Sequence, residues 1–301
     1  MIVRVRRAGL LTTVQDLGRW GYQAMGVPVA GPMDPYSHRL ANALVGNDEE
    51  AATLEVTLTG PELEFTDDRH VVVTGAEFEG LSNGVRHVRA GDRLVFGPRI
   101  RGARAYVAIS GGIDTPSLLG SRATHTPSVM GGFEGRALKA GDELPLGRRV
   151  GPPKGVRDVP TTSTGRATLR VIPGPQLDKF APHALEALVS APYRVAPDSN
   201  RMGYRLEGPV LEHLTGADII SDATPLGALQ VPASGQPILL MADRQTTGGY
   251  AKIATLISAD VSVAGQLAPG DEVRFAVCSQ ADALSALIAQ ERQLMTAAGR
   301  S

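Results

Sequence analysis

The chain has 301 residues, which is enough for two domains of ordinary length or for one large β domain with a sizeable core. Its 30 basic and 31 acidic residues give a net charge of -1 at pH 7. Proteins that bind nucleic acid usually carry an excess of positive charge for the phosphate backbone. We therefore expect no nucleic-acid partner.

The single cysteine and the lack of a long apolar run indicate where in the cell the protein is located. Cys278 is the only cysteine, which excludes an intramolecular disulfide and is typical of a reducing environment. The first seven residues lack the apolar stretch and cleavage site of a secretory signal, and no apolar run is long enough to span a membrane. We predict a cytoplasmic protein without a membrane partner, in which Cys278 is a buried, inert thiol.

Glycine and proline occur throughout the chain, 35 and 21 times, and long helical periods are few. This pattern is typical of many short strands joined by tight turns, so we predict a mainly β fold with a few short helices. Alternating apolar and polar residues predict nine strands, at residues 2–6, 54–59, 70–74, 93–96, 104–110, 168–172, 238–242, 252–258 and 272–278.

Three helices have recognisable ends. Asp34 and Pro35 form an N-cap and a first-turn proline, and Gly46 can end that helix in the left-handed conformation. A second helix is expected to begin near Pro182. The third should begin at Ser279. Asp282 completes its capping box, and its apolar stripe is expected to face the core: Leu284, Leu287, Ile288 and Leu294.

A segment rich in Pro, Gly, Ser and Thr divides the chain. We predict an N-terminal β domain at residues 1–150, a linker at 151–167 and a C-terminal β domain at 168–301 that carries the polar site motifs. Residues 19–22 match residues 201–204, and a Gly-Asp turn at 91–92 matches others at 141–142 and 270–271. These repeats indicate a duplicated β domain.

Several catalytic signatures are absent from the sequence. There is no P-loop, no G-x-S-x-G nucleophile elbow and no metal-ligand spacing among the histidines, so we predict no metal. No lysine is flanked by methionine on both sides, so the chain is not expected to carry biotin itself.

Residues 199–205 place two arginines and a tyrosine around a glycine. Fixed positive charge, a phenolic hydroxyl and a permissive backbone suit a carboxylate, a carbamate or a phosphate. The alternative is a β-bulge whose arginines make surface ion pairs. The candidate residues are Asn200, Arg201, Tyr204 and Arg205.

Residues 227–253 are the richest segment, because two polar, glycine-rich turns flank the apolar strand predicted at 238–242. Asp243 beside Arg244 and Lys252 could orient these cations or take a proton from an amide-like nitrogen. The alternative is a hairpin with an internal ion pair from Asp243 to Arg244 or Lys252. We favour a small-molecule site, with these neutral groups as substrate ligands: Gln230, Ser234, Gln236, Gln245, Thr246 and Tyr250.

A third candidate lies near the N-terminus. Trp20, the only tryptophan, could form an apolar interface patch with Tyr22 and Met33. The alternative is that these residues belong to the core of the first domain.

These motifs together resemble the biotin-dependent carboxyltransferase family, also labelled allophanate hydrolase subunit 2 and, in bacteria, the C subunit of 5-oxoprolinase. The resemblance extends over nearly the whole chain. The matching segments are residues 12–21, 31–34, 109–122, 135–142, 173–176, 200–205 and 227–253.

The resemblance implies a cyclophilin-like β-barrel architecture in two similar halves, with a separate partner of the subunit 1 (B) type. In the 5-oxoprolinase relatives a third protein, the A component, joins the pair, and the complex uses ATP to open 5-oxoproline to L-glutamate. In the biotin-dependent relatives, carboxybiotin on another protein passes its carboxyl group to an amide nitrogen.

Both reactions polarise an amide carbonyl, so both need donors aimed at a developing oxyanion. Arg201, Arg205, Arg244 and Lys252 fit that role, and Asp243 or Tyr204 could transfer the proton. The leading interpretation is the C subunit of an ATP-dependent 5-oxoprolinase, inactive alone. The alternatives are the carboxyltransferase half of a urea or amide carboxylase and a non-catalytic regulatory partner of the subunit 1 protein.

Overall fold

The structure is a computed structural model that describes residues 1–81, 84–151, 165–297 and 299. The chain forms two compact units. Unit 1 comprises Met1–Arg19, Ala30–Thr162 and Glu291–Ser301, and unit 2 comprises Trp20–Val29 and Ser163–Gln290. Most of the predicted linker at 151–167 lies outside the described residues, and the domain boundaries stay a prediction.

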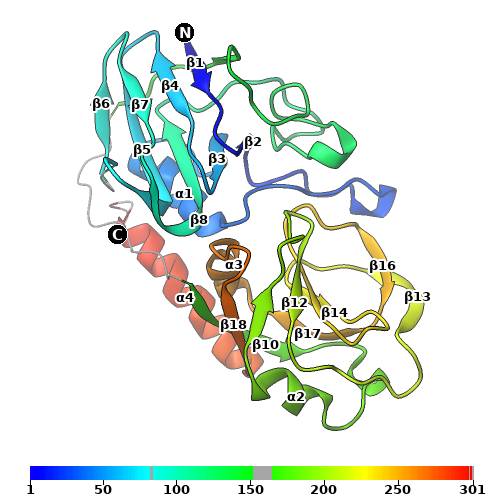
Figure 1. Cartoon of the computed structure of the whole chain (residues 1–301). Coiled ribbons are helices and arrows are strands. Elements are labelled where there is room, and N and C mark those ends of the chain that lie inside the picture. The colour runs from blue at the N-terminus through cyan, green and yellow to red at the C-terminus, as the bar shows by residue number, and fades with distance from the viewer. Residues whose placement is uncertain (82–83, 152–164, 298, 300–301) are drawn as a thin grey trace. The chain divides into compact units, whose positions relative to one another are not determined.

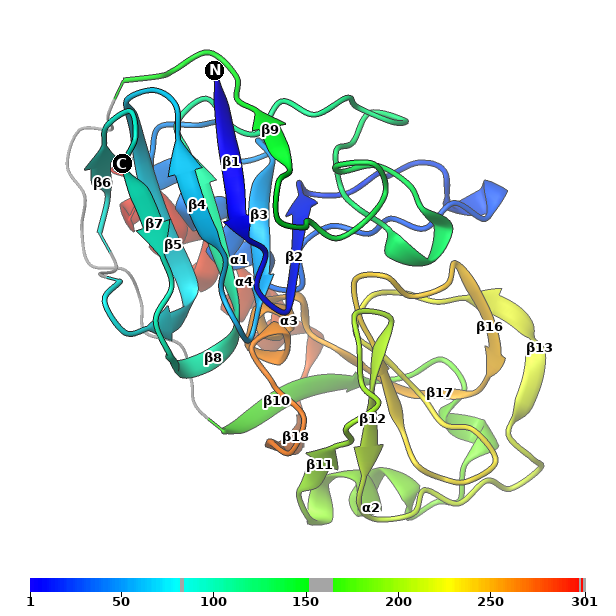
Figure 2. The same cartoon turned by 45° about the horizontal axis from the view of Figure 1, so that its top comes forward.

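The strands of unit 1 form two antiparallel sheets, whose apolar faces share one core that includes Leu54, Leu63 and Phe65. Figure 2 shows β1, β4 and β7 side by side. The four-stranded sheet has the order β7 (Arg93–Val95), β4 (Glu62–Phe65), β1 (Ile2–Arg7) and β9 (Glu143–Pro145). The five-stranded sheet has the order β2 (Leu11–Gln15), β3 (Thr53–Thr57), β8 (Arg99–Ile109), β5 (Arg69–Phe78) and β6 (Arg86–Val88).

The strands of unit 2 close into a barrel, in which β10 and β18 pair in parallel and the other pairs are antiparallel (Figure 1). The order is β10 (Arg166–Pro173), β17 (Lys252–Leu256), β14 (Ala228–Gln230), β15 (Ile238–Leu240), β12 (Gly203–Glu207), β11 (Tyr193–Val195) and β18 (Glu272–Val277). A separate ribbon pairs β13 (Asp218–Ala223) with β16 (Thr247–Tyr250). The prediction of a mainly β fold is confirmed, and all nine predicted strands form.

Two predicted helix caps are confirmed. In α1 (Pro35–Leu44), Asp34 Oδ1 accepts the N–H of Ser37 at 2.9 Å, and Gly46 follows the helix with φ 79°. In α4 (Gln280–Ala297), the N–H of Asp282 donates to Ser279 Oγ at 3.1 Å, and the Asp282 carboxylate accepts from Ser279.

The predicted core stripe of α4 is wrong in its first half. Leu284 and Ile288 are exposed, and Leu294 and Ala297 alone are buried among the described residues of this helix. The buried cluster that contains Leu40 includes only Leu294 and Ala297 of this helix. The second helix, α2 (Ala184–Ser190), begins near the expected place, whereas α3 (Ser258–Gly265) was not predicted.

Three short connections share one geometry. In each Gly-Asp turn the glycine has φ between 88° and 94°, and the aspartate carboxylate accepts the backbone N–H of the residue three positions earlier at 2.8 Å. The turns are Gly91–Asp92, Gly141–Asp142 and Gly270–Asp271. The repeat in the sequence is therefore a repeat of local structure, since only glycine adopts this φ without strain.

Replacement of two glycines by alanine should separate backbone strain from steric overlap. Gly270 has φ 92° and no atom within 4 Å of an added Cβ, so Gly270→Ala should cost about 1–2 kcal/mol of stability. Gly227 has φ 82°, but its added Cβ would lie 2.8 Å from Cβ of Leu256. We expect Gly227→Ala to lower the urea midpoint of unfolding further than Gly270→Ala, the matched control. Equal shifts would contradict this prediction.

Candidate active site

The polar segment predicted as the site lies on four strands and their connections in unit 2. Gln230 ends β14, the turn at 243–246 follows β15, Tyr250 ends β16, and Lys252 begins β17. β14 pairs with both β15 and β17, so the ends of these strands are neighbours. The barrel therefore gathers residues that are well separated in the sequence.

A cavity of about 170 Å³, termed the Gln230 cavity, contains five of the residues predicted to bind substrate. Gln230 Oε1 accepts from Gln245 Nε2 at 3.3 Å, and Gln230 Nε2 donates to the carbonyl of Tyr250 at 3.4 Å. The five residues are Asn200, Arg205, Gln230, Gln245 and Tyr250.

A second cavity of about 350 Å³, termed the Arg244 cavity, lies in the same unit. One wall is the segment Trp20–Val29, which belongs to unit 2 although unit 1 residues flank it on both sides. Gln245 lines both cavities, so they adjoin at its side chain. The other lining residues are Ala223, Thr224, Pro225, Arg244 and Thr246.

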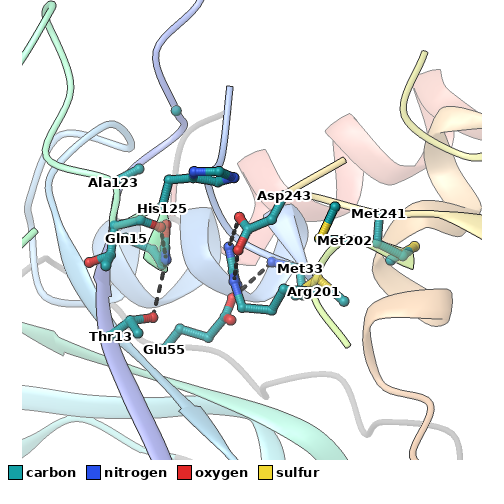
Figure 3. Close-up of polar contacts among 12 residues, drawn as sticks. Thr13, Gln15, Met33, Glu55, Ala123, His125, Arg201, Met202, Met241 and Asp243 are labelled. Carbon is teal, nitrogen blue, oxygen red and sulfur yellow. Dashed lines mark hydrogen bonds and ion pairs between the residues drawn. The ribbon is translucent and has the colours of Figure 1, made fainter. Parts of the chain in front are cut away.

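A buried ion pair joins Arg201 to Asp243 (Figure 3). Nε of Arg201 lies 2.9 Å from Oδ2 of Asp243, and Nη2 lies 2.9 Å from Oδ1. The backbone N–H of Asp243 also donates to the carbonyl of Arg201 at 2.8 Å. The carboxylate therefore pairs with Arg201. The hairpin alternative required an ion pair with Arg244 or Lys252, which does not form.

Arg244 has a different environment. Its Nε donates to the carbonyl of Thr224 at 2.8 Å, and its Nη1 lies 3.4 Å from the carbonyl of Met241. Within the part of the chain that the structure describes, no carboxylate pairs with this guanidinium, and Nη2 has no hydrogen-bond partner. Burial lowers the pKa of Arg244 to about 10, because the charged form loses solvation.

Lys252 is buried, with 1% of its surface exposed, and its Nζ lies 2.8 Å from Oδ2 of Asp222, whose side chain is 49% exposed. The hydrogen bond from Lys252 is the main cause that lowers the pKa of Asp222. Gln176 Nε2 donates to the same carboxylate oxygen at 3.3 Å. Sequence reasoning missed Asp222 and Gln176, because β13 and the loop after β10 reach Lys252 only through the fold.

Several predicted site residues line neither cavity. Tyr204 is buried within β12, and Ser234 is exposed. The side chain of Gln236 is held by the backbone of Gly208, whose N–H donates to Oε1 at 2.9 Å and whose carbonyl accepts from Nε2 at 3.0 Å. Arg201, Asp243 and Lys252 also lie outside both linings.

The three predicted interface residues differ in exposure. Trp20 is 58% exposed and lines the Arg244 cavity. Tyr22 is half-buried and lines neither cavity. Met33 is fully buried, and its N–H donates to Glu55 Oε2 at 2.8 Å (Figure 3). Met33 therefore offers no side-chain surface to an exposed patch.

Comparison with known proteins decides the family, since residues 25–277 match the carboxyltransferase domain, subdomain A and B. The chain belongs to this carboxyltransferase family. It is 39% identical over 298 residues to the C subunit of 5-oxoprolinase from Escherichia coli (strain K12), a match that covers 97% of this chain and 96% of the relative. The C subunit of 5-oxoprolinase from Haemophilus influenzae is 35% identical over 280 residues, or 90% of this chain and 89% of the relative.

A solved structure supports the same fold. The crystal structure of the Kluyveromyces lactis urea carboxylase matches with a TM-score of 0.91 and 33% identity over 98% of this chain. The match covers 29% of the urea carboxylase chain, so this protein corresponds to one part of that larger enzyme. The resemblance drawn from the sequence motifs is confirmed.

Three further predictions concerned a metal site, a membrane span and the thiol of Cys278, and the described residues of this carboxyltransferase-family chain bear on each. Those residues contain no group of three or more His, Cys, Asp or Glu placed to hold a metal ion. None of the helices described is long and apolar enough to cross a membrane. Cys278 is only partly buried, not fully buried as predicted, because it lies just beyond the end of β18.

A double-mutant cycle should measure the buried ion pair. Arg201→Met should lower the free energy of unfolding by about 3–5 kcal/mol, because the Asp243 carboxylate is left buried without its partner. Adding Asp243→Leu removes both charges and should recover most of that loss. Urea denaturation followed by circular dichroism gives the three values. A double variant no more stable than Arg201→Met would contradict the assignment.

Proposed function

We propose that this protein is the C subunit of an ATP-dependent 5-oxoprolinase, which adds water across the lactam C–N bond of 5-oxoproline to give L-glutamate. One observation carries the proposal: the chain is coextensive with the C subunit of 5-oxoprolinase, covering 96% of the relative from Escherichia coli. That relative is 39% identical to this chain, whereas the urea carboxylase is 33% identical.

The site is suited to an amide substrate. Negative charge develops on the carbonyl oxygen when a lactam is attacked, and cationic or amide donors in a shielded cavity stabilise it. Gln230 and Gln245 supply such donors to the Gln230 cavity, and Arg244 supplies a cation to the adjoining one. Arg205 also lines the Gln230 cavity, where its exposed side chain pairs with Asp198 at 2.8 Å. We assign Arg201 and Asp243 a positioning role, since they form an ion pair with each other and line neither cavity.

The proposal includes partners and ATP. We infer that the chain is inactive alone and acts in a cytoplasmic complex with a subunit 1 (B) type protein and a homologue of the A component. The sequence has no P-loop, and neither cavity has the glycine-rich backbone cradle that such a loop gives to phosphates. We therefore derive no step through ATP on this chain and place its use in the complex.

A second candidate function is the carboxyltransferase half of a urea or amide carboxylase. The TM-score of 0.91 to the Kluyveromyces lactis urea carboxylase favours it. In that case carboxybiotin would be delivered on another protein, and the amide nitrogen would receive the carboxyl group. The same donors would then polarise the carbonyl of the acceptor amide.

Reconstitution distinguishes these functions. The chain is mixed with its subunit 1 (B) type partner and its A component, and glutamate released from 5-oxoproline is measured with ATP. We expect release only when all three proteins and ATP are present. Glutamate release without this chain would contradict the proposal. Biotin-dependent carboxylation of urea in place of release would favour the second function, and neither activity would favour a regulatory role.

Lys252 is expected to contribute its charge to the reaction. Because Lys252 lies outside both cavities, we propose that it acts by holding Asp222, and in the assembled complex Lys252→Met should lower kcat by at least about tenfold. Lys179→Met is the matched control, because Lys179 belongs to the same unit and its side chain makes no hydrogen bond or ion pair with the described residues. If kcat of Lys252→Met stays within about twofold of the control, Lys252 has no such role.

A further inference from the structure

Arg244 is a buried cation without an acidic partner among the described residues. Only 8% of its surface is exposed, yet the two acceptors that it contacts are neutral backbone carbonyls. A buried guanidinium normally has a carboxylate beside it, because the loss of solvation is otherwise uncompensated. Two other buried cations of unit 2 follow this rule, since Arg201 pairs with Asp243 and Lys252 with Asp222.

The uncompensated charge lies on a cavity wall. Arg244 lines the cavity of about 350 Å³, a volume at the lower end of small-ligand pockets, which span about 300–1,000 Å³. Since Nη2 has no partner among the described residues, it is available to a ligand in this cavity. The cation that lacks a counter-ion therefore lies beside a space large enough for a small ligand.

The remaining walls define the rest of the ligand. Trp20, Val29 and Pro225 provide apolar surface, which suits a small ring. Thr246 is half-buried, and its hydroxyl makes no hydrogen bond to the described residues. Gln245 leads to the Gln230 cavity, so polar groups of a ligand have partners on that side.

We propose that the Arg244 cavity binds a small cyclic acid through its carboxylate, with the guanidinium of Arg244 as the counter-ion and the ring against Trp20. The class of ligand follows from the cavity, and the identification of that acid as 5-oxoproline rests on the proposed function. With its carboxylate on Arg244, the lactam of 5-oxoproline lies toward Gln245 and Thr246. Arg244 is then a specificity residue for the acid, in addition to the amide donors.

Binding to the full chain tests this inference without any turnover. Isothermal titration calorimetry compares 5-oxoproline and tetrahydrofuran-2-carboxylate with two neutral analogues, 5-oxoprolinamide and 2-pyrrolidone. A charge-assisted hydrogen bond to a carboxylate should make each acid bind at least about tenfold more tightly than the neutral analogues. Acids that bind no more tightly than the neutral analogues, or do not bind, would overturn the inference.

Variants locate the contact. Arg244→Gln should weaken both acids at least about tenfold and leave 2-pyrrolidone unchanged, and Trp20→Ala should weaken all four ligands. Arg166→Gln is the charge control, since Arg166 is 84% exposed in the same unit. Thermal unfolding checks that each variant is folded. If Arg244→Gln does not fold, the comparison of acids with neutral analogues and the Trp20→Ala data still decide.

Failure of the two proposals can be told apart. If both acids bind through Arg244 but the reconstituted complex releases no glutamate, the cavity assignment stands and the 5-oxoprolinase assignment fails. If glutamate is released but Arg244→Gln leaves KM for 5-oxoproline unchanged, the carboxylate contact is wrong and the proposed function stands.

Discussion

The buried ion pair between Arg201 and Asp243 is the constraint on which the site depends. It joins the turn before β12 to the connection after β15, and a backbone hydrogen bond from Asp243 to Arg201 doubles the link. Removal of Arg201 alone would leave the Asp243 carboxylate buried without this partner. The residues that follow Asp243 therefore project from a fixed backbone, and these include Arg244 and Gln245, which line the cavities.

Three buried cations in unit 2 differ in how far a carboxylate compensates their charge. Arg201 makes two hydrogen bonds to Asp243 and lines neither cavity, so we assign it a positioning role. Lys252 is paired with Asp222, whose side chain is 49% exposed, so the charge of Lys252 is only partly compensated. Arg244 has no acid beside it within the described residues, which leaves it as the cation with a charge to offer an anionic ligand.

The sequence predicted more of the barrel than of the site. Alternation located β15 and β17, and the polar residues between them do reach shared cavities, because strand ends meet wherever strands pair. Roles were less predictable. Asp222 carries no local signal, since its pairing with Lys252 depends on the ribbon formed by β13 and β16. The segment Trp20–Val29 joins unit 2 through contacts distant in sequence, which periodicity does not report.

A crystal structure of the chain with 5-oxoproline bound would show directly which group neutralises Arg244. The expected result is the ligand carboxylate within hydrogen-bond distance of Arg244 Nη2, the ring against Trp20 and the lactam near Gln245. A structure in which Arg244 pairs with a carboxylate of the protein itself, or in which the ligand lies outside this cavity, would contradict it.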